Sequence, residues 1–304
     1  MKNIVLITCN DNYVSKSIVA LNLFNKYNPK YKKVIIGTVF RKKTKELCNK
    51  FNITLIEIDL KEDFIDLDKR PYGLEYPIEC YYHFYAYKLF KDYDYIVKIE
   101  PDIYTNKKLD IDFNLVNVIG GGHMPESSKS IKNFTPLMDD YNKIKKVYGN
   151  GNKNQFRILG GVKIYNIKKM LDINFYEKIV KYYKTSIKIK APRCGDDSLM
   201  VMYQLLNPSH IYLFEPKFHI IWSSNIKNLN CIDITFFHMT GGNPKYWNIK
   251  NDKKLNNVQK YFYNNIMEYI YNNFTIEFIK EYLSEIYTNI KNTKIPFYYY
   301  NSVD

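Results

Sequence analysis

Tyr95-Ile-Val-Lys-Ile-Glu-Pro-Asp-Ile-Tyr104 is a short apolar run that ends in two carboxylates, Glu100 and Asp102. Its β-branched residues predict a buried strand, and Pro101 ends that strand because proline has no N–H to donate. Residues two apart in extended backbone point the same way, so Glu100 and Asp102 should project together. Two such charges repel unless a cation lies between them, and oxygen ligands suit Mg²⁺ or Mn²⁺. From these ten residues alone, a solvated acidic turn explains the pattern equally well.

The chain before this run alternates between strand and helix patterns. We expect strands at 3–8, 33–40 and 53–58 and helices at 13–27 and 41–51. This alternation is typical of an α/β protein with a mostly parallel sheet flanked by crossover helices. Ligands of such proteins bind at the carboxyl ends of the strands, and the polar loop from Cys9 to Tyr13 lies at one of them.

The chain after this run predicts more of the same sheet and then a helical extension. We expect helices at 79–91, 167–185 and from 195, and strands at 115–122 (with a glycine exit), 158–166, 211–214, 219–222 and 232–238. Residues 123–156 form a long polar connection with a short helix near 138–148, which is typical of a lid, a substrate loop or disorder. Between 258 and 291 the spacing predicts two amphipathic helices packed on the sheet, or lying on a membrane surface. We therefore divide the chain into a domain at 1–250 and a helical extension at 251–304 packed on it.

Composition narrows the class of protein. The chain has 304 residues, and its formal net charge of +14 favours anionic partners such as nucleotides, polyanions or membrane surfaces. No block of basic residues forms a nucleic-acid motif, so we expect no nucleic-acid partner. The five cysteines are odd in number and widely spaced, which predicts neither a zinc site nor a disulfide framework. With no apolar leader or spanning segment in view, we expect a reduced, cytoplasmic protein without a membrane span.

Four features recur together and in order: the loop from Thr8 to Tyr13, Glu100-x-Asp102, Asp196-Asp197 at a helix start, and His238 before a Gly/Lys/Trp segment. Over residues 3–250 this arrangement resembles glycosyltransferases of the GT-A type, specifically the glycogenin-like family 8. The resemblance implies a Rossmann-like GT-A fold. The Glu-Pro-Asp form of the acidic motif also resembles fungal mannosyltransferases of the Kre2 type.

The resemblance assigns nucleotide contacts to the first loop. Thr8-Cys-Asn-Asp-Asn-Tyr13 looks like the family's nucleotide-binding loop, which implies that Tyr13 lies on the uracil face and that Asn10 holds the base or ribose. An aromatic face and amide hydrogen bonds suit a flat polar base. Without the resemblance, Tyr13 is equally explained as an aromatic residue at the entry to a helix.

The resemblance also assigns the metal and diphosphate contacts. His238-Met-Thr-Gly-Gly-Asn-Pro-Lys-Tyr-Trp247 is similar to the family's His-x-x-Gly-x-x-Lys-Pro-Trp segment, with one extra residue and the Pro–Lys order exchanged. This implies that His238 is a third metal ligand beside Glu100 and Asp102. Gly241 and Lys245 would approach the diphosphate. An imidazole ligand favours Mn²⁺ over Mg²⁺.

The donor-sugar contacts match the family less closely. Cys194-Gly-Asp-Asp-Ser-Leu-Met200 is similar to the family's Asp-Gln-x-Leu-Leu segment, which implies that Asp196 lies at the sugar, with Asp197 beside it as a second catalytic candidate. Helix capping explains either aspartate as well. The family's Asn-x-Gly reads Leu159-Gly-Gly161 here, and its basic residue before the metal strand falls on or near His83.

The resemblance implies transfer of glucose or galactose from UDP-glucose or UDP-galactose to a hydroxyl of a glycan or protein acceptor, with retention of configuration. Mn²⁺ is the expected cofactor, Mg²⁺ is the second choice, and relatives are often homodimers. Three alternatives stay open: a transferase that uses GDP-mannose, a degenerate protein that binds a nucleotide sugar without turnover, and a basic nucleic-acid-binding protein.

Overall fold

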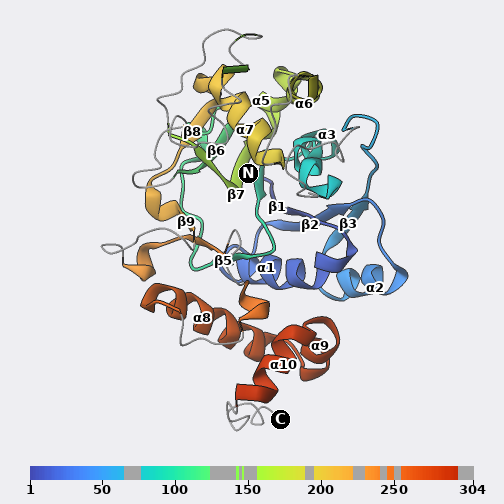
Figure 1. Cartoon of the computed structure of the whole chain (residues 1–304), viewed down its shortest axis with the longest axis vertical. Coiled ribbons are helices and arrows are strands. Elements are labelled where there is room, and N and C mark those ends of the chain that lie inside the picture. Colours follow the sequence, from blue (N-terminus) through green and yellow to red (C-terminus); the bar gives the residue numbers. More distant parts are fainter. Residues whose placement is uncertain are drawn as a thin grey trace.

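The computed structural model describes residues 1–64, 77–123, 142–143, 146, 156–188, 195–221, 230–239, 245–249 and 255–293. These residues form a mixed α/β fold around two sheets (Figure 1). The larger sheet has the order β3-β2-β1-β4-β7-β6-β8, and all of its strands run parallel except β7. The smaller sheet has the order β5-β10-β9.

The strands of the larger sheet are β1 (Asn3–Thr8), β2 (Lys32–Gly37), β3 (Thr54–Glu57), β4 (Tyr95–Lys98), β6 (Ile119–His123), β7 (Ile158–Asn166) and β8 (Ile211–Leu213). Those of the smaller sheet are β5 (Ile103–Thr105), β9 (His219–Ile221) and β10 (Phe236–His238). The predicted α/β class, with a mostly parallel sheet flanked by helices, is confirmed.

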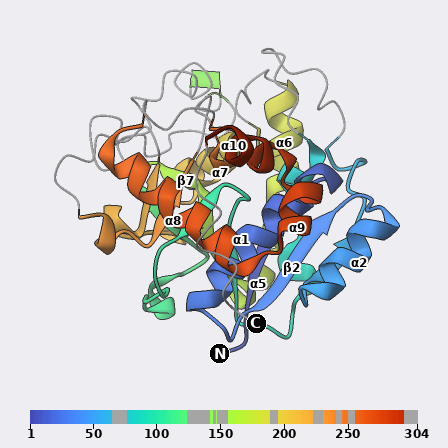
Figure 2. The same cartoon turned by 90° about the horizontal axis from the view of Figure 1, so that it is seen from below.

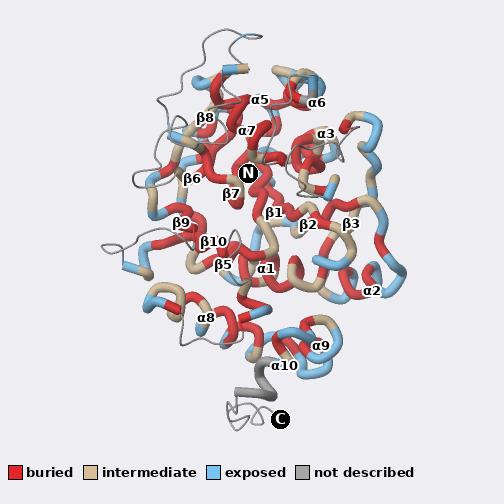
Figure 3. The backbone as a smooth tube through the Cα atoms, in the orientation of Figure 1, coloured by how far each residue is buried: buried red, intermediate tan, exposed pale blue. Residues whose placement is uncertain are grey.

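Helices cover both faces of the larger sheet. The α-helices of the described residues are α1 (Val14–Tyr27), α2 (Lys42–Lys50), α3 (Ala86–Leu89), α5 (Ile167–Asp172), α6 (Phe175–Lys188), α7 (Gly195–Leu206), α8 (Asn257–Asn273), α9 (Ile276–Tyr282) and α10 (Ser284–Thr293). Alternate residues of β1 point to opposite faces: Val5 and Ile7 pack toward α1, whereas Ile4 and Leu6 pack toward α6 and α7. The sheet is therefore buried on both sides, as Figure 3 shows.

The C-terminal helices share the core on the α1 side of the sheet. In Figure 2 they lie across α1, and the Phe262 ring of α8 stacks on Phe237 of β10 with centroids 4.0 Å apart. Phe278 of α9 and Ile286 of α10 belong to the same buried cluster as Val5. This apolar contact packs the C-terminal helices against α1 and the smaller sheet. None of the helices in the described ranges has both the length and the apolar character that crossing a bilayer requires.

Three predicted helices differ from the observed ones. Residues 78–84 form a 3₁₀ helix (Ile78–Phe84) before the short α3, because four consecutive side chains, Tyr81 to Phe84, are buried and no solvated stripe remains. The helix expected at 167–185 breaks at Asn174, whose φ of 51° ends α5 before α6 begins. Within residues 255–293, the described part of the C-terminal extension, there are three helices instead of two, because Thr275 caps a new one with a hydrogen bond from the Phe278 N–H.

The glycines at 120–122 lie inside β6 and do not form its exit. The strand begins at Ile119, after a 3₁₀ turn at Phe113–Leu115, and its glycines leave room for neighbouring side chains. A Cβ on Gly122 would lie 2.6 Å from the His219 Cβ. Likewise, β10 begins at 236, after a turn at Cys231–Asp233. The helix expected near 138–148 falls almost wholly outside the described residues.

Candidate metal and donor site

Two strand ends bring the predicted metal ligands together. Glu100 and Asp102 lie between β4 and β5, where the chain leaves the larger sheet and enters the smaller one. β5 pairs with β10, so that Ile103 lies opposite His238, and the Met239 N–H donates to the Asp102 carbonyl at 3.1 Å. The pairing therefore places an imidazole against an acidic pair that is distant from it in the chain.

Ligand atoms of Glu100, Asp102 and His238 all lie within 4.8 Å of one another. The His238 Nε2 is 3.0 Å from Glu100 Oε2 and 3.3 Å from Asp102 Oδ1. This nitrogen is buried and makes no hydrogen bond of acceptable geometry to a described group. Two carboxylates and an imidazole nitrogen that faces the space between them suit a divalent cation of the Mn²⁺ kind.

Each acidic side chain also holds a lysine. Glu100 Oε1 accepts a hydrogen bond from Lys98 Nζ at 2.7 Å, and Asp102 Oδ2 accepts one from Lys245 Nζ. Lys245 also donates to the Met239 carbonyl at 2.7 Å. Each carboxylate thus directs one oxygen toward His238 and the other toward an ammonium group. The lysines leave one oxygen of each carboxylate free to face a cation.

The charges in this cluster shift one another's titration. Burial alone would lower the pKa of His238, but the Asp102 and Glu100 carboxylates raise it to about 9. Burial opposes ionisation of Glu100, yet Lys98 and His238 hold its pKa well below the usual value. The pKa of Asp102 is lowered in the same way, chiefly by His238. Both acids are therefore ionised at neutral pH, whereas His238 must release its proton before its Nε2 can bind a metal.

A second acidic pair begins α7. Asp196 is buried, and its Oδ2 lies 3.0 Å from His83 Nε2 and 3.8 Å from Lys163 Nζ. The Asp197 side chain is 43% exposed, and its Oδ1 lies 3.4 Å from the same lysine. Partial burial raises the pKa of Asp197, and Lys163 offsets this only in part. Asp197 is consequently the more accessible carboxylate, whereas Asp196 is buried against His83 and Lys163.

Gly160 joins the two acidic pairs. Its carbonyl accepts hydrogen bonds from Lys163 at 2.8 Å and from Lys98 at 3.2 Å. A Cβ at this position would lie 2.0 Å from Asp197 Oδ1, so the absence of a side chain lets the carboxylate approach the strand. The segment 159–161, where the chain departs from the family's Asn-x-Gly, thus contacts both halves of the site.

The first loop lies at the carboxyl end of β1. Asn10 Oδ1 accepts a hydrogen bond from the Asn12 N–H and so caps the 3₁₀ turn Asp11–Tyr13. Tyr13 is 45% exposed and meets Trp247 edge-on, with ring centroids 6.3 Å apart. An exposed aromatic face is therefore available next to the segment that carries Lys245.

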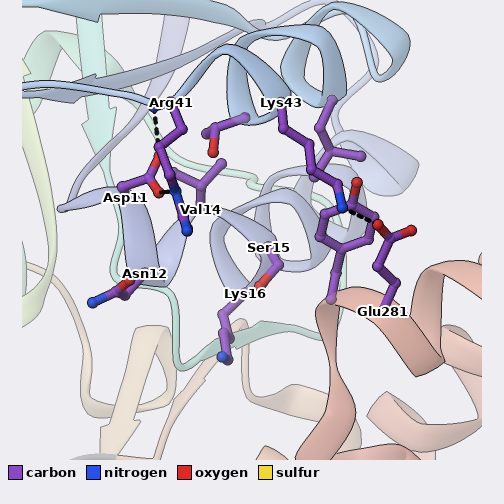
Figure 4. Close-up of a pocket in the computed structure, with 11 residues that line it drawn as sticks. Asp11, Asn12, Val14, Ser15, Lys16, Arg41, Lys43 and Glu281 are labelled. Carbon is purple, nitrogen blue, oxygen red and sulfur yellow. Dashed lines mark hydrogen bonds and ion pairs between the residues drawn. The ribbon is translucent and has the colours of Figure 1, made fainter.

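A cavity of about 290 Å³ lies behind this loop (Figure 4). Asp11 binds Arg41 on one side of the cavity, and Lys43 binds Glu281 of α9 on another. These ion pairs connect the first loop to α2 and α2 to the C-terminal helices. The positive groups at this cavity are thus already paired.

Comparison with known proteins gives the fold. No protein-family model matches the sequence, and no curated protein matches it at a significant level. Among solved structures, LgtC, a galactosyltransferase in complex with donor and acceptor sugar analogues, aligns with a TM-score of 0.63 at 15% identity, over 92% of this chain and 99% of that one. The bifunctional glycosyltransferase WbbM aligns with a TM-score of 0.62 at 15% identity, over 95% of this chain. The chain spans about half of WbbM, 51% of its length.

The chain has the GT-A fold. Mouse xyloside xylosyltransferase 1 shares this fold with a TM-score of 0.50 at 12% identity, over 80% of this chain and 99% of that one. The expected Rossmann-like GT-A architecture is thereby confirmed. At these identities the likeness concerns the fold, and residue roles rest on the geometry of this chain.

The GT-A fold brings most of the predicted site residues into two groups and one loop. Glu100, Asp102 and His238 form one group with Lys245. Asp196 and Asp197 form the second, with the fully buried His83 behind Asp196. The loop carries the remaining candidates described: Thr8 at the end of β1, Asn10 and Tyr13. Gly241 lies outside the described residues.

Sequence reasoning missed two buried lysines of the GT-A core. The side chains of Lys98 and Lys163 are 4% and 0% exposed, and they lie on the facing strands β4 and β7. Both occur in the tripeptide Val-Lys-Ile, a charge inside an apolar strand pattern. Buried lysines are almost always paired with acids, so this pattern could have pointed to them.

His83 predicts an acid sensitivity of the folded protein. Burial lowers its pKa from 6.5 to about 4 despite Asp196, so the neutral ring donates to Asp196 from Nε2 and accepts from the Tyr165 hydroxyl at Nδ1, 2.7 Å away. As the pH falls, the His83 imidazole therefore gains a proton in the unfolded chain before it does so in the folded one. His83 therefore lowers the free energy of unfolding by about 1.4 kcal/mol per pH unit between 6.5 and 4, about 3 kcal/mol in all.

Denaturant unfolding at a series of pH values measures this effect. The variant His83→Gln keeps a donor for Asp196 but has no proton to gain, so its acid slope should be shallower than that of the native chain by about one proton. Equal slopes for the two proteins would contradict the assignment.

Proposed function

We propose that the chain is a metal-dependent glycosyltransferase that moves a hexose, glucose or galactose, from a UDP-sugar to a hydroxyl acceptor with retention of configuration. The observation that carries this proposal is the convergence of His238 Nε2 with Glu100 Oε2, 3.0 Å away, and Asp102 Oδ1, 3.3 Å away, at the strand ends of a GT-A fold. The likeness to LgtC, which is a galactosyltransferase, supports a hexose donor.

In this proposal Glu100, Asp102 and His238 hold Mn²⁺, or Mg²⁺ in its place. When bound, the cation acts as a Lewis acid that stabilises the negative charge developing on the departing diphosphate. Lys245, at the edge of the same cluster, adds a second positive charge for that group. Tyr13 and Asn10 of the first loop, with Thr8, hold the base and ribose.

The second acidic group would act on the donor sugar. Asp197, the more exposed of the pair, would face the sugar hydroxyls and the reacting carbon, and Asp196 beside it would complete the sugar contacts. His83 and Lys163, which contact Asp196, keep its carboxylate ionised and fix its position. The backbone around Gly241 would approach the diphosphate. The acceptor would be a glycan or a protein hydroxyl, and the resemblance implies a homodimer.

A nucleotide-sugar panel tests this function. The chain with Mn²⁺ is incubated with UDP-glucose, UDP-galactose, UDP-xylose and GDP-mannose, and the release of free nucleoside diphosphate is measured. We expect slow UDP release from one UDP-hexose even without an acceptor, and loss of that release on chelation. Release of GDP alone would favour the GDP-mannose alternative, which the Glu100-Pro-Asp102 motif motivates. Binding without any release would instead indicate a degenerate protein.

A further inference from the structure

Lys98 lies directly behind one of the metal-ligating carboxylates. It precedes Glu100 by two residues, so the strand backbone directs both side chains to the same face. Its Nζ is held by Glu100 Oε1 at 2.7 Å and by the Gly160 carbonyl at 3.2 Å, and its side chain is 4% exposed. The ammonium group is thus fixed a few ångströms from the place where a cation would bind.

Positively charged side chains already neutralise the two acidic ligands in the free protein. Glu100 and Asp102 carry two negative charges, and Lys98 and Lys245, each bonded to one of them, carry two positive charges. The imidazole of His238, which contacts both carboxylates, adds a third positive charge when it is protonated and loses it when it binds a metal. A divalent cation that arrives alone is attracted by the carboxylates and repelled by both ammonium groups. A cation that arrives with a diphosphate brings negative charge, and the same ammonium groups then attract the complex.

We propose that Lys98, assisted by Lys245, makes cation binding depend on the diphosphate of the donor. The free protein binds the divalent cation weakly, and the nucleoside diphosphate and the cation bind tightly together. This inference rests on the proposed function, because it assumes that the cation and the diphosphate share the site. Lys98 is a positioning residue, because it does not bind the cation itself. It acts on the cation through its hydrogen bond to Glu100 and through electrostatic repulsion.

The test measures Mn²⁺ binding from the electron paramagnetic resonance signal of free Mn²⁺, with and without UDP or GDP, corrected for Mn²⁺ bound to free nucleotide. In the native chain we expect a saturating diphosphate to tighten Mn²⁺ binding at least about tenfold. Lys98→Met keeps the length of the side chain and removes its charge. This variant should bind Mn²⁺ alone about tenfold more tightly than the native chain and show weaker coupling to the nucleotide.

Two further variants distinguish the effect of removing the Lys98 charge from an effect of misfolding. Lys33→Met removes a lysine of β2 whose Nζ bonds to Asn22 and the Phe51 carbonyl, so it should leave Mn²⁺ affinity and coupling unchanged. If Lys98→Met does not fold, Lys245→Met removes the second, more exposed charge and should shift Mn²⁺ affinity in the same direction.

Two results would overturn the inference: weaker Mn²⁺ binding by the folded Lys98→Met variant, which would make Lys98 a structural support of Glu100, or unchanged coupling in that variant. The proposed function fails separately. A chain that couples Mn²⁺ to UDP or GDP but releases no diphosphate from any nucleotide sugar would retain this inference and lose the transferase assignment.

Discussion

Asp102→Asn should lower diphosphate release from the donor about 1,000-fold, the scale seen when one preorganised charge-stabilising group is removed. The amide keeps the shape of the side chain but not its charge, so the cation loses one of two anionic ligands. Asp102 is 5% exposed, and its carboxylate also neutralises Lys245 and His238, which would both lose a partner. Mn²⁺ affinity and turnover, measured on the same preparation, should therefore fall together.

The control for this substitution is Asp112→Asn. Asp112 is exposed and caps a 3₁₀ turn by accepting the Asn114 N–H, a bond that an asparagine oxygen can also accept. Its turnover should stay within about twofold of the native value, as for most surface substitutions. Asp102→Asn protein that folds, as judged by circular dichroism, and keeps more than a tenth of the turnover would contradict the ligand assignment.

Gly161→Ala should disable the proposed metal site, although it replaces none of the proposed ligands. A Cβ at this position would lie 2.3 Å from His238 Nδ1. β7 is paired with β4 on one side and β6 on the other, so the backbone has little freedom to yield and the imidazole must move. We expect Mn²⁺ affinity to fall at least about tenfold and turnover about 100-fold, since small misplacements of catalytic groups have effects of this size.

Gly120→Ala is the matched control. Gly120 lies on the neighbouring strand β6, and its added Cβ would meet the Phe214 ring at 2.7 Å, in the core and not at a ligand. This variant should melt at a lower temperature than the native chain, while each folded molecule binds Mn²⁺ normally. If Gly161→Ala also lost only stability, the close packing of Gly161 on His238 would have no role in metal binding.

The strands and their faces could be predicted from local patterns. The observed β1 and β7 have the predicted bounds, 3–8 and 158–166, because the run of mostly apolar residues that marks a buried strand lies within the strand itself. Glu100 and Asp102 were found in the same way, as carboxylates at a strand end. The predicted strand boundaries were wrong where contacts with residues distant in the chain decide them. Gly120–Gly122 are an example, because their neighbours come from β7, β8 and β9.

Cross-strand contacts produced the parts of the site that sequence reasoning did not reach. Lys98 and Lys163 face each other across the β4–β7 pair, and their shared acceptor, the Gly160 carbonyl, cannot be found from either tripeptide alone. The different exposures of Asp196 and Asp197 likewise follow from His83, which lies far from them in the chain.

The amino-acid sequence by itself determined the α/β class, the acidic pair and the family likeness, since each of these depends on short motifs or on the order in which they occur along the chain. Folding determined which atoms meet. The β5–β10 pairing sets His238 against Asp102, and burial fixes two lysines behind the acids. The physical reason is that burial of the whole sheet selects these long-range pairings, and no single segment contains that information.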